Sequence, residues 1–289
     1  MERAVIAVAG DADRVLAAAL ADLGPVLAEL RGSVLVVGGL MQRIWLELRP
    51  VEGISPRSTA DIDLGIDRQS LRLTATSERV GPLLTERGYI PLAGEDGFRF
   101  EKALEQGSMI VDLLVAKGAS RDEPPILEKG IATLAAPGLA YALTRPTVSV
   151  ELELVDERGS TVVEVPLPSL DAAFVLKAAL VASGVRVRPD RRERDTVDAV
   201  MLAAVCASDS AAVHALAEGS GRSEVKRALA LLREGLGRAD RAAARRVVDY
   251  LQRERGVAPE IGGEWVVQVA ARLASRVDAA RRQRQRDGQ

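Results

Sequence analysis

The chain has 289 residues, of which 47% are hydrophobic and 28% are charged, a composition typical of a globular protein with one large or two modest domains. No apolar run is long enough to span a bilayer and no signal peptide opens the sequence, so we expect a cytoplasmic protein with no membrane partner. A single cysteine and a single histidine exclude an internal disulfide and a histidine-rich zinc site, and they argue against Ser-His or Cys-His catalysis.

Charge is unevenly distributed along the chain, although the formal net charge is only −2. From Asp171 to the end, 22 Lys and Arg stand against 16 Asp and Glu, whereas the first 170 residues carry 17 against 25. An acidic part followed by a basic part favours an anionic substrate that contacts both. The alternative is that the arginine-rich helices are simply solvated.

The N-terminal segment, Met1 to Arg31, predicts a strand or extended piece followed by a helix. Asp11 or Asp13 is suited to cap this helix, and Gly24-Pro25 is expected to interrupt it. The segment carries packing residues and no evident chemistry.

A buried strand is predicted over Val34 to Val37, directly before Gly38-Gly39 and a helix over Leu40 to Leu48. Tandem glycines before a helix let a phosphate approach backbone N–H groups at the positive end of the helix. A plain turn is the alternative for the glycine pair. Pro50 to Pro56 is expected to be a loop.

The next predicted strand contains Asp61 and Asp63, which are two residues apart and therefore point to the same face. Two adjacent carboxylates repel, and a divalent cation would remove that repulsion. Oxygen ligands favour Mg²⁺ or Mn²⁺. A solvated strand edge is the alternative.

Helix is predicted for Ser70 to Gly88, and strands for Gly97 to Phe100 and for Met109 to Val115. Asp112 interrupts the otherwise apolar second strand, so its carboxylate needs a partner if it is buried. Placed beside the Asp61 strand, Asp112 would complete a site of three carboxylates. The alternative is an ion pair between Asp112 and an arginine such as Arg99.

Further strands are expected within Glu128 to Thr133 and Thr147 to Val165, with Pro166 and Pro168 ending the sheet region. Helical periodicity begins at Ser169. The sequence therefore predicts an α/β (α+β) domain with a mixed sheet over residues 1–168 and a mostly helical domain over residues 169–289.

Lys177 lies in the apolar helical run AAFVLKAALVA, where a lysine either extends its ammonium to solvent or meets an anion. An arginine-rich loop is expected over Arg186 to Arg194, followed by a helix with Asp195 and Asp198 near its start, where the helix dipole favours acids. Amphipathic helices continue over Ser210 to Val257 and Glu264 to Arg282, before a frayed tail. His214 is expected to be a solvated or half-buried helix residue.

The order of strand, Gly38-Gly39, helix and Asp61-x-Asp63 resembles the DNA polymerase-β-like nucleotidyltransferase superfamily. The segment from Arg57 to Leu64, RSTADIDL, is similar to the AbiEii/AbiGii toxin family, which often reads R-x-S-x-D-x-D-L. Thr59 stands where a serine is usual, and the separation from Gly39 to Asp61 is longer than in the compact superfamily signature. The resemblance covers about Val34 to Asp198. It extends to Lys177 in an A-x-K helix and to Arg194-Asp195-x-x-Asp198-Ala199, where the family reads K-D-x-x-D-L.

This resemblance implies an enzyme that transfers a nucleoside monophosphate from an NTP, with the cleft between the two domains. It implies Mg²⁺ or Mn²⁺ at Asp61, Asp63 and Asp112, with Asp112 as the general base. The implied nucleotide contacts are the Gly38, Gly39, Arg57, Ser58 and Thr59 phosphate cradle, Lys177 at the triphosphate, and Asp198 orienting the nucleotide or the acceptor. The implied acceptor is RNA, the 3′ end of tRNA, rather than DNA, with a cognate antitoxin as partner.

Two other functions are compatible with the same residues. A small-molecule (antibiotic) nucleotidyltransferase would use the same carboxylates, with an acidic pocket for a cationic acceptor. A nucleotide- or partner-binding module without turnover is the non-enzyme alternative, although all three aspartates are present.

Overall fold

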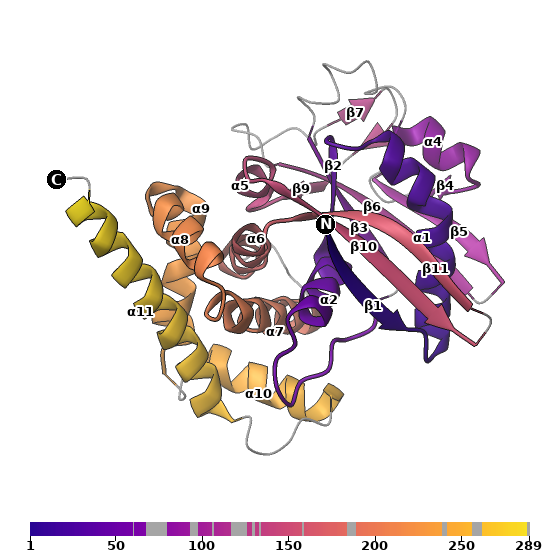
Figure 1. Cartoon of the computed structure of the whole chain (residues 1–289). Helices are drawn as coiled ribbons and strands as arrows, with labels where there is room; N and C mark the ends of the chain where they lie inside the picture. Colours follow the sequence, from indigo (N-terminus) through magenta and orange to yellow (C-terminus); the bar gives the residue numbers. More distant parts are fainter. Residues whose placement is uncertain are drawn as a thin grey trace. The chain divides into compact units, whose positions relative to one another are not determined.

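The computed structural model describes residues 1–59, 61–67, 80–92, 98–105, 107–116, 126–128, 131–132, 134–157, 159–183, 189–238, 242–255 and 262–287. The chain divides into two compact units. The first unit contains Met1–Leu48 and Arg57–Pro168, and the second contains Arg49–Pro56 and Ser169–Gln289. The expected mixed α/β content, with a mixed sheet and a helical C-terminal region, is confirmed (Figure 1).

The main sheet of the first unit has the strand order β2-β3-β6-β5-β4, with β9 also paired to β6. β3 runs parallel to β6, whereas β2 is antiparallel to β3 and β5 is antiparallel to both β4 and β6. The strands are β2 (Val34–Val37), β3 (Asp61–Ile66), β4 (Ile90–Pro91), β5 (Arg99–Leu104), β6 (Gly107–Ala116) and β9 (Leu134–Ala136).

β6 lies between partners on both sides, which explains its nearly continuous apolar sequence. The helices that the structure describes in this unit are α1 (Asp11–Glu29), α2 (Gly38–Leu48), α4 (Val80–Glu86) and α5 (Leu139–Leu143). β7 (Ile126–Glu128) and β8 (Ile131–Ala132) form a separate two-stranded sheet.

A second sheet of three strands has the order β1-β10-β11, formed by β1 (Glu2–Ala7), β10 (Thr147–Asp156) and β11 (Gly159–Pro168). β11 runs through Pro166, so this proline does not end the sheet as expected. Since β11 is the last strand in this order, the missing proline N–H removes no bond to a further strand. The indole N–H of Trp45 in α2 donates to the Pro168 carbonyl and fixes the end of β11 (3.2 Å).

Helix α1 packs against β11 and is continuous, so the expected interruption at Gly24-Pro25 is wrong. Burial of its apolar face against the sheet outweighs the one backbone hydrogen bond that a proline removes. The expected cap is also different: Gly10 is the N-cap and makes no side-chain hydrogen bond.

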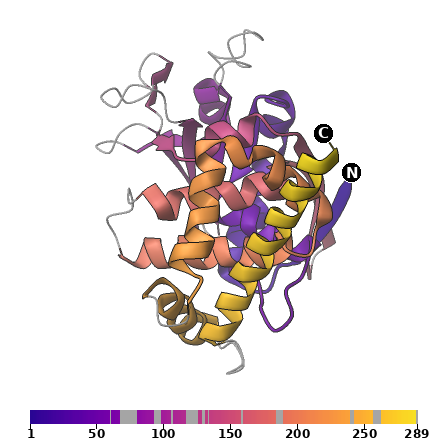
Figure 2. The same ribbon diagram turned by 90° about the vertical axis from the view of Figure 1, so that its left-hand side faces the viewer.

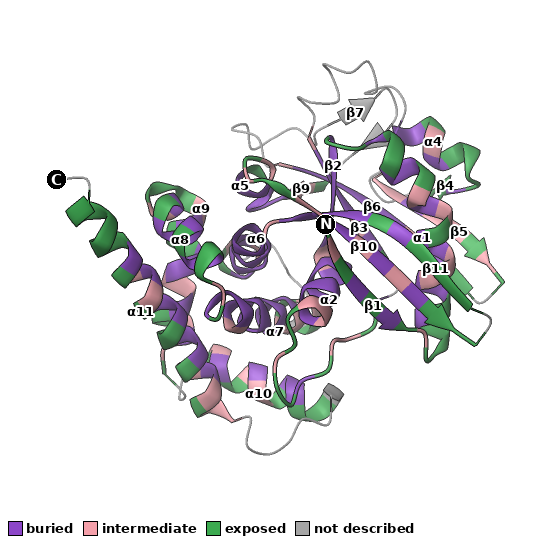
Figure 3. Ribbon diagram, viewed as in Figure 1, coloured by how far each residue is buried: buried purple, intermediate pink, exposed green. Residues whose placement is uncertain are grey.

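The second unit is helical, and its longest helix is the C-terminal α11 (Figure 2). α6 is buried on almost its whole surface, whereas α10 and α11 alternate buried and exposed residues (Figure 3). The helices are α6 (Leu170–Ser183), α7 (Pro189–Cys206), α8 (Ser210–Glu218), α9 (Ser223–Ala230), α10 (Ala242–Arg255) and α11 (Gly263–Asp287).

Two expectations for the second unit need correction. α7 already begins at Pro189, so Arg191, Arg192 and Arg194 lie on a helix and not in a loop. α11 continues to Asp287, so the basic C-terminal segment is helical and not frayed over that range.

Several sequence predictions lie outside the described residues, namely Ser70 to Arg79 of the expected helix, Gly97, Gln106, Thr133, Arg186 and Arg188. Within the described part of the chain, no single helix combines the length and the apolar composition needed to cross a membrane.

Candidate active site

Strand register brings the three predicted aspartates to one face of the main sheet. Asp63 on β3 is the register partner of Asp112 on the neighbouring parallel strand β6. Register partners on adjacent strands point to the same face, and Asp61, two residues before Asp63, points there too. Asp61 is exposed, Asp63 is half-buried, and Asp112 is only 7% exposed. The face therefore grades from solvent at Asp61 to the interior at Asp112.

Gly38 lies directly against the Asp63 carboxylate at the start of α2. Its φ of +71° is in the left-handed region, and a Cβ there would lie 1.7 Å from Oδ2 of Asp63. Only a glycine fits, because both the backbone conformation and the carboxylate exclude a side chain. The beginning of α2, where backbone N–H groups lack helical acceptors, is thus in contact with Asp63.

Gly39 makes a similar contact with the segment before β3. A Cβ on Gly39 would lie 2.6 Å from Nη2 of Arg57 and 3.0 Å from Oγ1 of Thr59. The structure therefore brings Arg57 and Thr59 to the start of α2, next to the Gly38–Asp63 contact. A guanidinium, a hydroxyl and helix N-terminal N–H groups are all groups that bind phosphate oxygens.

A buried ion pair between Asp13 and Arg43 binds the segment before β3 through Ser58. Nη1 of Arg43 lies 2.6 Å from Oδ1 of Asp13, and the same oxygen accepts a hydrogen bond from the Ser58 hydroxyl (2.9 Å). Both charged residues are more than nine-tenths buried. Burial raises the pKa of Asp13, but the hydrogen bond and charge of Arg43, with the Ser58 hydroxyl, outweigh it and hold the pKa below its ordinary value. Ser58 is thereby fixed between Arg57 and Thr59.

Asp112 forms a bidentate ion pair with Arg99 on β5, the alternative partner expected from the sequence. Nε of Arg99 lies 2.7 Å from Oδ1, and Nη2 lies 2.7 Å from Oδ2. The two residues are also register partners, so the pair runs straight across the sheet. Both carboxylate oxygens of Asp112 are therefore already bound to a cation.

The three aspartates fit a hard divalent cation in donor type and in strand position. Among the residues that the structure describes, however, no group of three or more His, Cys, Asp or Glu side chains is placed to hold a metal ion. The guanidinium of Arg99 occupies the position at Asp112 where a metal cation would bind. A metal ion bound by all three aspartates would have to compete with Arg99 for Asp112.

Lys177 belongs to the second unit, where it forms a buried cluster with Asp195 and Asp198. Its Nζ lies 2.9 Å from Oδ2 of Asp198 and 3.2 Å from Oδ1 of Asp195. Lys177 is 2% exposed and Asp198 is 0% exposed, so Lys177 meets anions and does not extend to solvent. Asp195 and Asp198 lie well inside α7, so a position at the helix start does not explain them.

The remaining single-residue expectations concern groups outside these clusters. His214 is exposed on α8, in agreement with a solvated helix residue. Cys206 is fully buried, and burial together with the charges of Asp171 and Asp209 raises the pKa of its thiol. A buried thiol with a raised pKa is a poor nucleophile.

Sequence reasoning missed the roles of Asp13 and Arg43. Asp13 was predicted only as a possible helix cap, and it is 30 residues away from its partner Arg43 in the chain. The signal that could have revealed the pair was Arg43 itself, because it is a charged residue in the mostly apolar helix GGLMQRIWLEL. A charge in such a helix is buried only with a partner.

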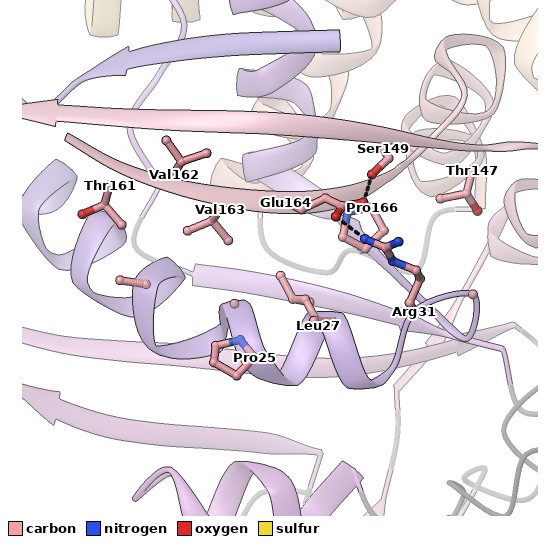
Figure 4. A pocket seen from close by; sticks show the side chains of 14 residues that line it. Pro25, Leu27, Arg31, Thr147, Ser149, Thr161, Val162, Val163, Glu164 and Pro166 are labelled. Atoms are coloured by element: carbon pink, nitrogen blue, oxygen red, sulfur yellow. Dashed lines mark hydrogen bonds and ion pairs between the residues drawn. The ribbon is translucent and has the colours of Figure 1, made fainter. Parts of the chain in front are cut away.

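A separate apolar groove of about 580 Å³ lies between α1 and the β10–β11 hairpin (Figure 4). Arg31 and Ser149 both bind the Glu164 carboxylate at one side of it. None of the predicted site residues lines this groove.

No protein-family model matches the chain, and no curated protein matches its sequence.

Proposed function

We propose that this protein is a metal-dependent nucleotidyltransferase with a DNA polymerase-β-like core in its first unit. One observation carries the proposal: Asp63 and Asp112 are register partners, Asp61 shares their face, and the Asp63 carboxylate contacts Gly38 at the start of α2. A carboxylate cluster next to a helix N-terminus suits a triphosphate with its divalent cations.

Asp61, Asp63 and Asp112 would hold Mg²⁺ or Mn²⁺. When bound, the cations would neutralise the triphosphate and the departing pyrophosphate. Gly38 and Gly39 offer backbone N–H groups to phosphate oxygens, and Arg57 and Thr59 add a guanidinium and a hydroxyl. Ser58, which lies between these two residues in the chain, ties the segment to α1 through its bond to Asp13. The Asp112 carboxylate would take the proton of the acceptor hydroxyl once it is free of Arg99.

The proposed roles of Lys177 at the triphosphate and Asp198 at the nucleotide or acceptor carry a condition. Lys177 is neutralised by two buried carboxylates, so a triphosphate has to compete with both for the ammonium. Asp198 likewise binds Lys177 with one of its oxygens.

We propose RNA, specifically the 3′ end of tRNA, as the acceptor, and a toxin role controlled by an antitoxin as in AbiEii/AbiGii-like proteins. The support is the resemblance of the motifs and the positive excess of the chain after residue 170. Arg191, Arg192 and Arg194 lie close together on the first turns of α7, where they could bind a phosphate backbone.

A module that binds a nucleotide or partner without turnover is the second candidate. The observation in its favour is the bidentate Arg99–Asp112 pair, which occupies the third carboxylate. A small-molecule nucleotidyltransferase has no specific observation in its favour.

The deciding experiment incubates the full chain with each α-labelled NTP, Mg²⁺ and total cellular RNA. Transfer of label to RNA supports the proposal, provided that Asp61→Asn and Asp63→Asn abolish it. Replacing the RNA by a cationic aminoglycoside tests the small-molecule acceptor. Tight NTP binding with no transfer to either acceptor would instead support the silent module.

A further inference from the structure

The aspartate face continues across a third strand to a cation. Asp112 on β6 has Asp63 as its register partner on β3 and Arg99 as its register partner on β5. The row therefore contains two carboxylates followed by a guanidinium, all on one face of the sheet. Arg99 is the residue at the end of this row that the metal-binding proposal leaves without a role.

The position of Arg99 at the border of the solvent makes an exchange of cations at Asp112 feasible. The two cations differ in exposure: the Arg99 side chain is 19% exposed, whereas that of Lys177 is 3% exposed. Asp112, at 10%, is about as exposed as Asp195, at 9%. The arginine therefore has a short path to water, where a released guanidinium is well solvated. A fully buried partner would have no such path, and its release would leave a charge in the protein interior.

The geometry also sets the two cations in competition for the same oxygens. Arg99 binds both oxygens of Asp112, one through Nε and the other through Nη2. A divalent ion shared by Asp63 and Asp112 needs at least one of these oxygens, and charge repulsion disfavours a guanidinium beside it.

From these observations we infer that Arg99 is a positioning residue that competes with the divalent cation for Asp112. Without the cation, Arg99 holds the Asp112 side chain in place and neutralises it. Binding of the cation displaces the guanidinium, so the Arg99–Asp112 pair lowers the affinity of the site for the metal. This inference rests on the proposed function, because it requires a metal at Asp63 and Asp112.

The test measures Mn²⁺ binding to the full chain by calorimetry, without any nucleotide or activity readout. Arg99→Gln removes the competing charge and both hydrogen bonds, so Mn²⁺ should bind about tenfold more tightly. Arg99→Lys keeps the charge but loses the bidentate fit, so its affinity should lie between those of the wild type and Arg99→Gln.

Lys102→Gln is the matched control, because Lys102 lies on the same strand and pairs with Asp22 (2.8 Å), which is not among the aspartates of the row. Mn²⁺ affinity should be unchanged in this variant. Circular dichroism and thermal unfolding establish that each variant is folded. If Arg99→Gln does not fold, Arg99→Lys decides the question.

Asp112→Asn separates failure of the inference from failure of the proposed function. If Asp112→Asn weakens Mn²⁺ binding while the Arg99 variants bind as the wild type does, the metal site stands and the competition is refuted. If Asp61→Asn and Asp112→Asn leave Mn²⁺ binding unchanged, there is no metal site at the aspartates, and both proposals fall.

Discussion

The two units of the chain each contain aspartates bound by a basic side chain, but they differ in their access to water. In the second unit, Lys177 and its partners Asp195 and Asp198 are all more than nine-tenths buried. In the first unit, Asp61 is exposed, and Asp112, although also more than nine-tenths buried, is paired with Arg99, whose side chain is 19% exposed. A ligand can reach the buried Lys177 only in competition with two buried carboxylates, whereas the more accessible Arg99 can leave its partner for water more easily.

The largest expected effect comes from breaking the buried cluster. Lys177→Met leaves two carboxylates in the interior without their cation, and removal of one partner of a buried pair costs roughly 3–5 kcal/mol. We expect a loss of this size in the free energy of unfolding, measured by urea titration. The triple variant Lys177→Met, Asp195→Asn, Asp198→Asn should recover much of the loss. A stable Lys177→Met protein would show that the cluster is hydrated.

The Asp13–Arg43 pair is the corresponding buried element of the first unit. Asp13→Asn removes the charge that Arg43 and Ser58 bind, so we expect a loss of about 2–3 kcal/mol in unfolding free energy at neutral pH. Since the folded pKa of Asp13 is lowered, its stabilising contribution is present above the unfolded value and is lost as the pH falls through the folded value.

This pH dependence gives Asp13→Asn a distinctive signature. The difference in stability between the wild type and the variant should shrink as the pH falls below about 3.8, the ordinary pKa of the carboxyl. Urea titrations at neutral pH and at two acidic pH values measure it. A difference that stays constant down to the lowest pH would contradict a charge-based role for Asp13.

Substitution of the exposed Asp61 should have a much smaller effect on stability. Asp61 is exposed, so Asp61→Asn should change the free energy of unfolding by no more than about 0.5 kcal/mol. Nucleotide transfer should nevertheless be abolished. The free energy of unfolding and the rate of nucleotide transfer are measured on the same variants. For Asp61→Asn only transfer should fall, whereas for Lys177→Met both should fall. An active Asp61→Asn protein would contradict the assignment of Asp61 as a metal ligand.

The smallest effect on folding is expected for the arginines at the start of α7. Neutralising Arg191 and Arg192 together should leave stability within about 0.5 kcal/mol of the wild type. RNA affinity should fall, and the slope of its logarithm against log salt should decrease by about 1 for each phosphate that the variant no longer neutralises. Filter binding at several salt concentrations measures the slope, and NTP binding is the control that should not change. RNA binding that responds to neither salt nor these arginines would contradict the RNA acceptor.

Local patterns were sufficient for most individual elements. The apolar run of β2, the alternation of β10 and the alanine-rich α6 were all recognisable, because periodicity in the sequence reflects which face an element buries. Sequence signals for helix interruptions and loops were less dependable: Pro25 lies inside α1, and Arg191, Arg192 and Arg194 lie on α7. Packing against neighbouring elements overrode the local preference at these places.

For the candidate site, the sequence by itself determined which residue types are available: three aspartates at strand positions, a glycine pair before a helix, and Lys177 in an apolar helix. Only the tertiary structure decided which charges meet. Strand register places Asp112 between Asp63 and Arg99, and α1 brings Asp13 to Arg43 and to Ser58, 45 residues away. The reason is physical: helical and strand periods repeat within a few residues, whereas register and charge pairing are set by the packing of segments far apart in the chain.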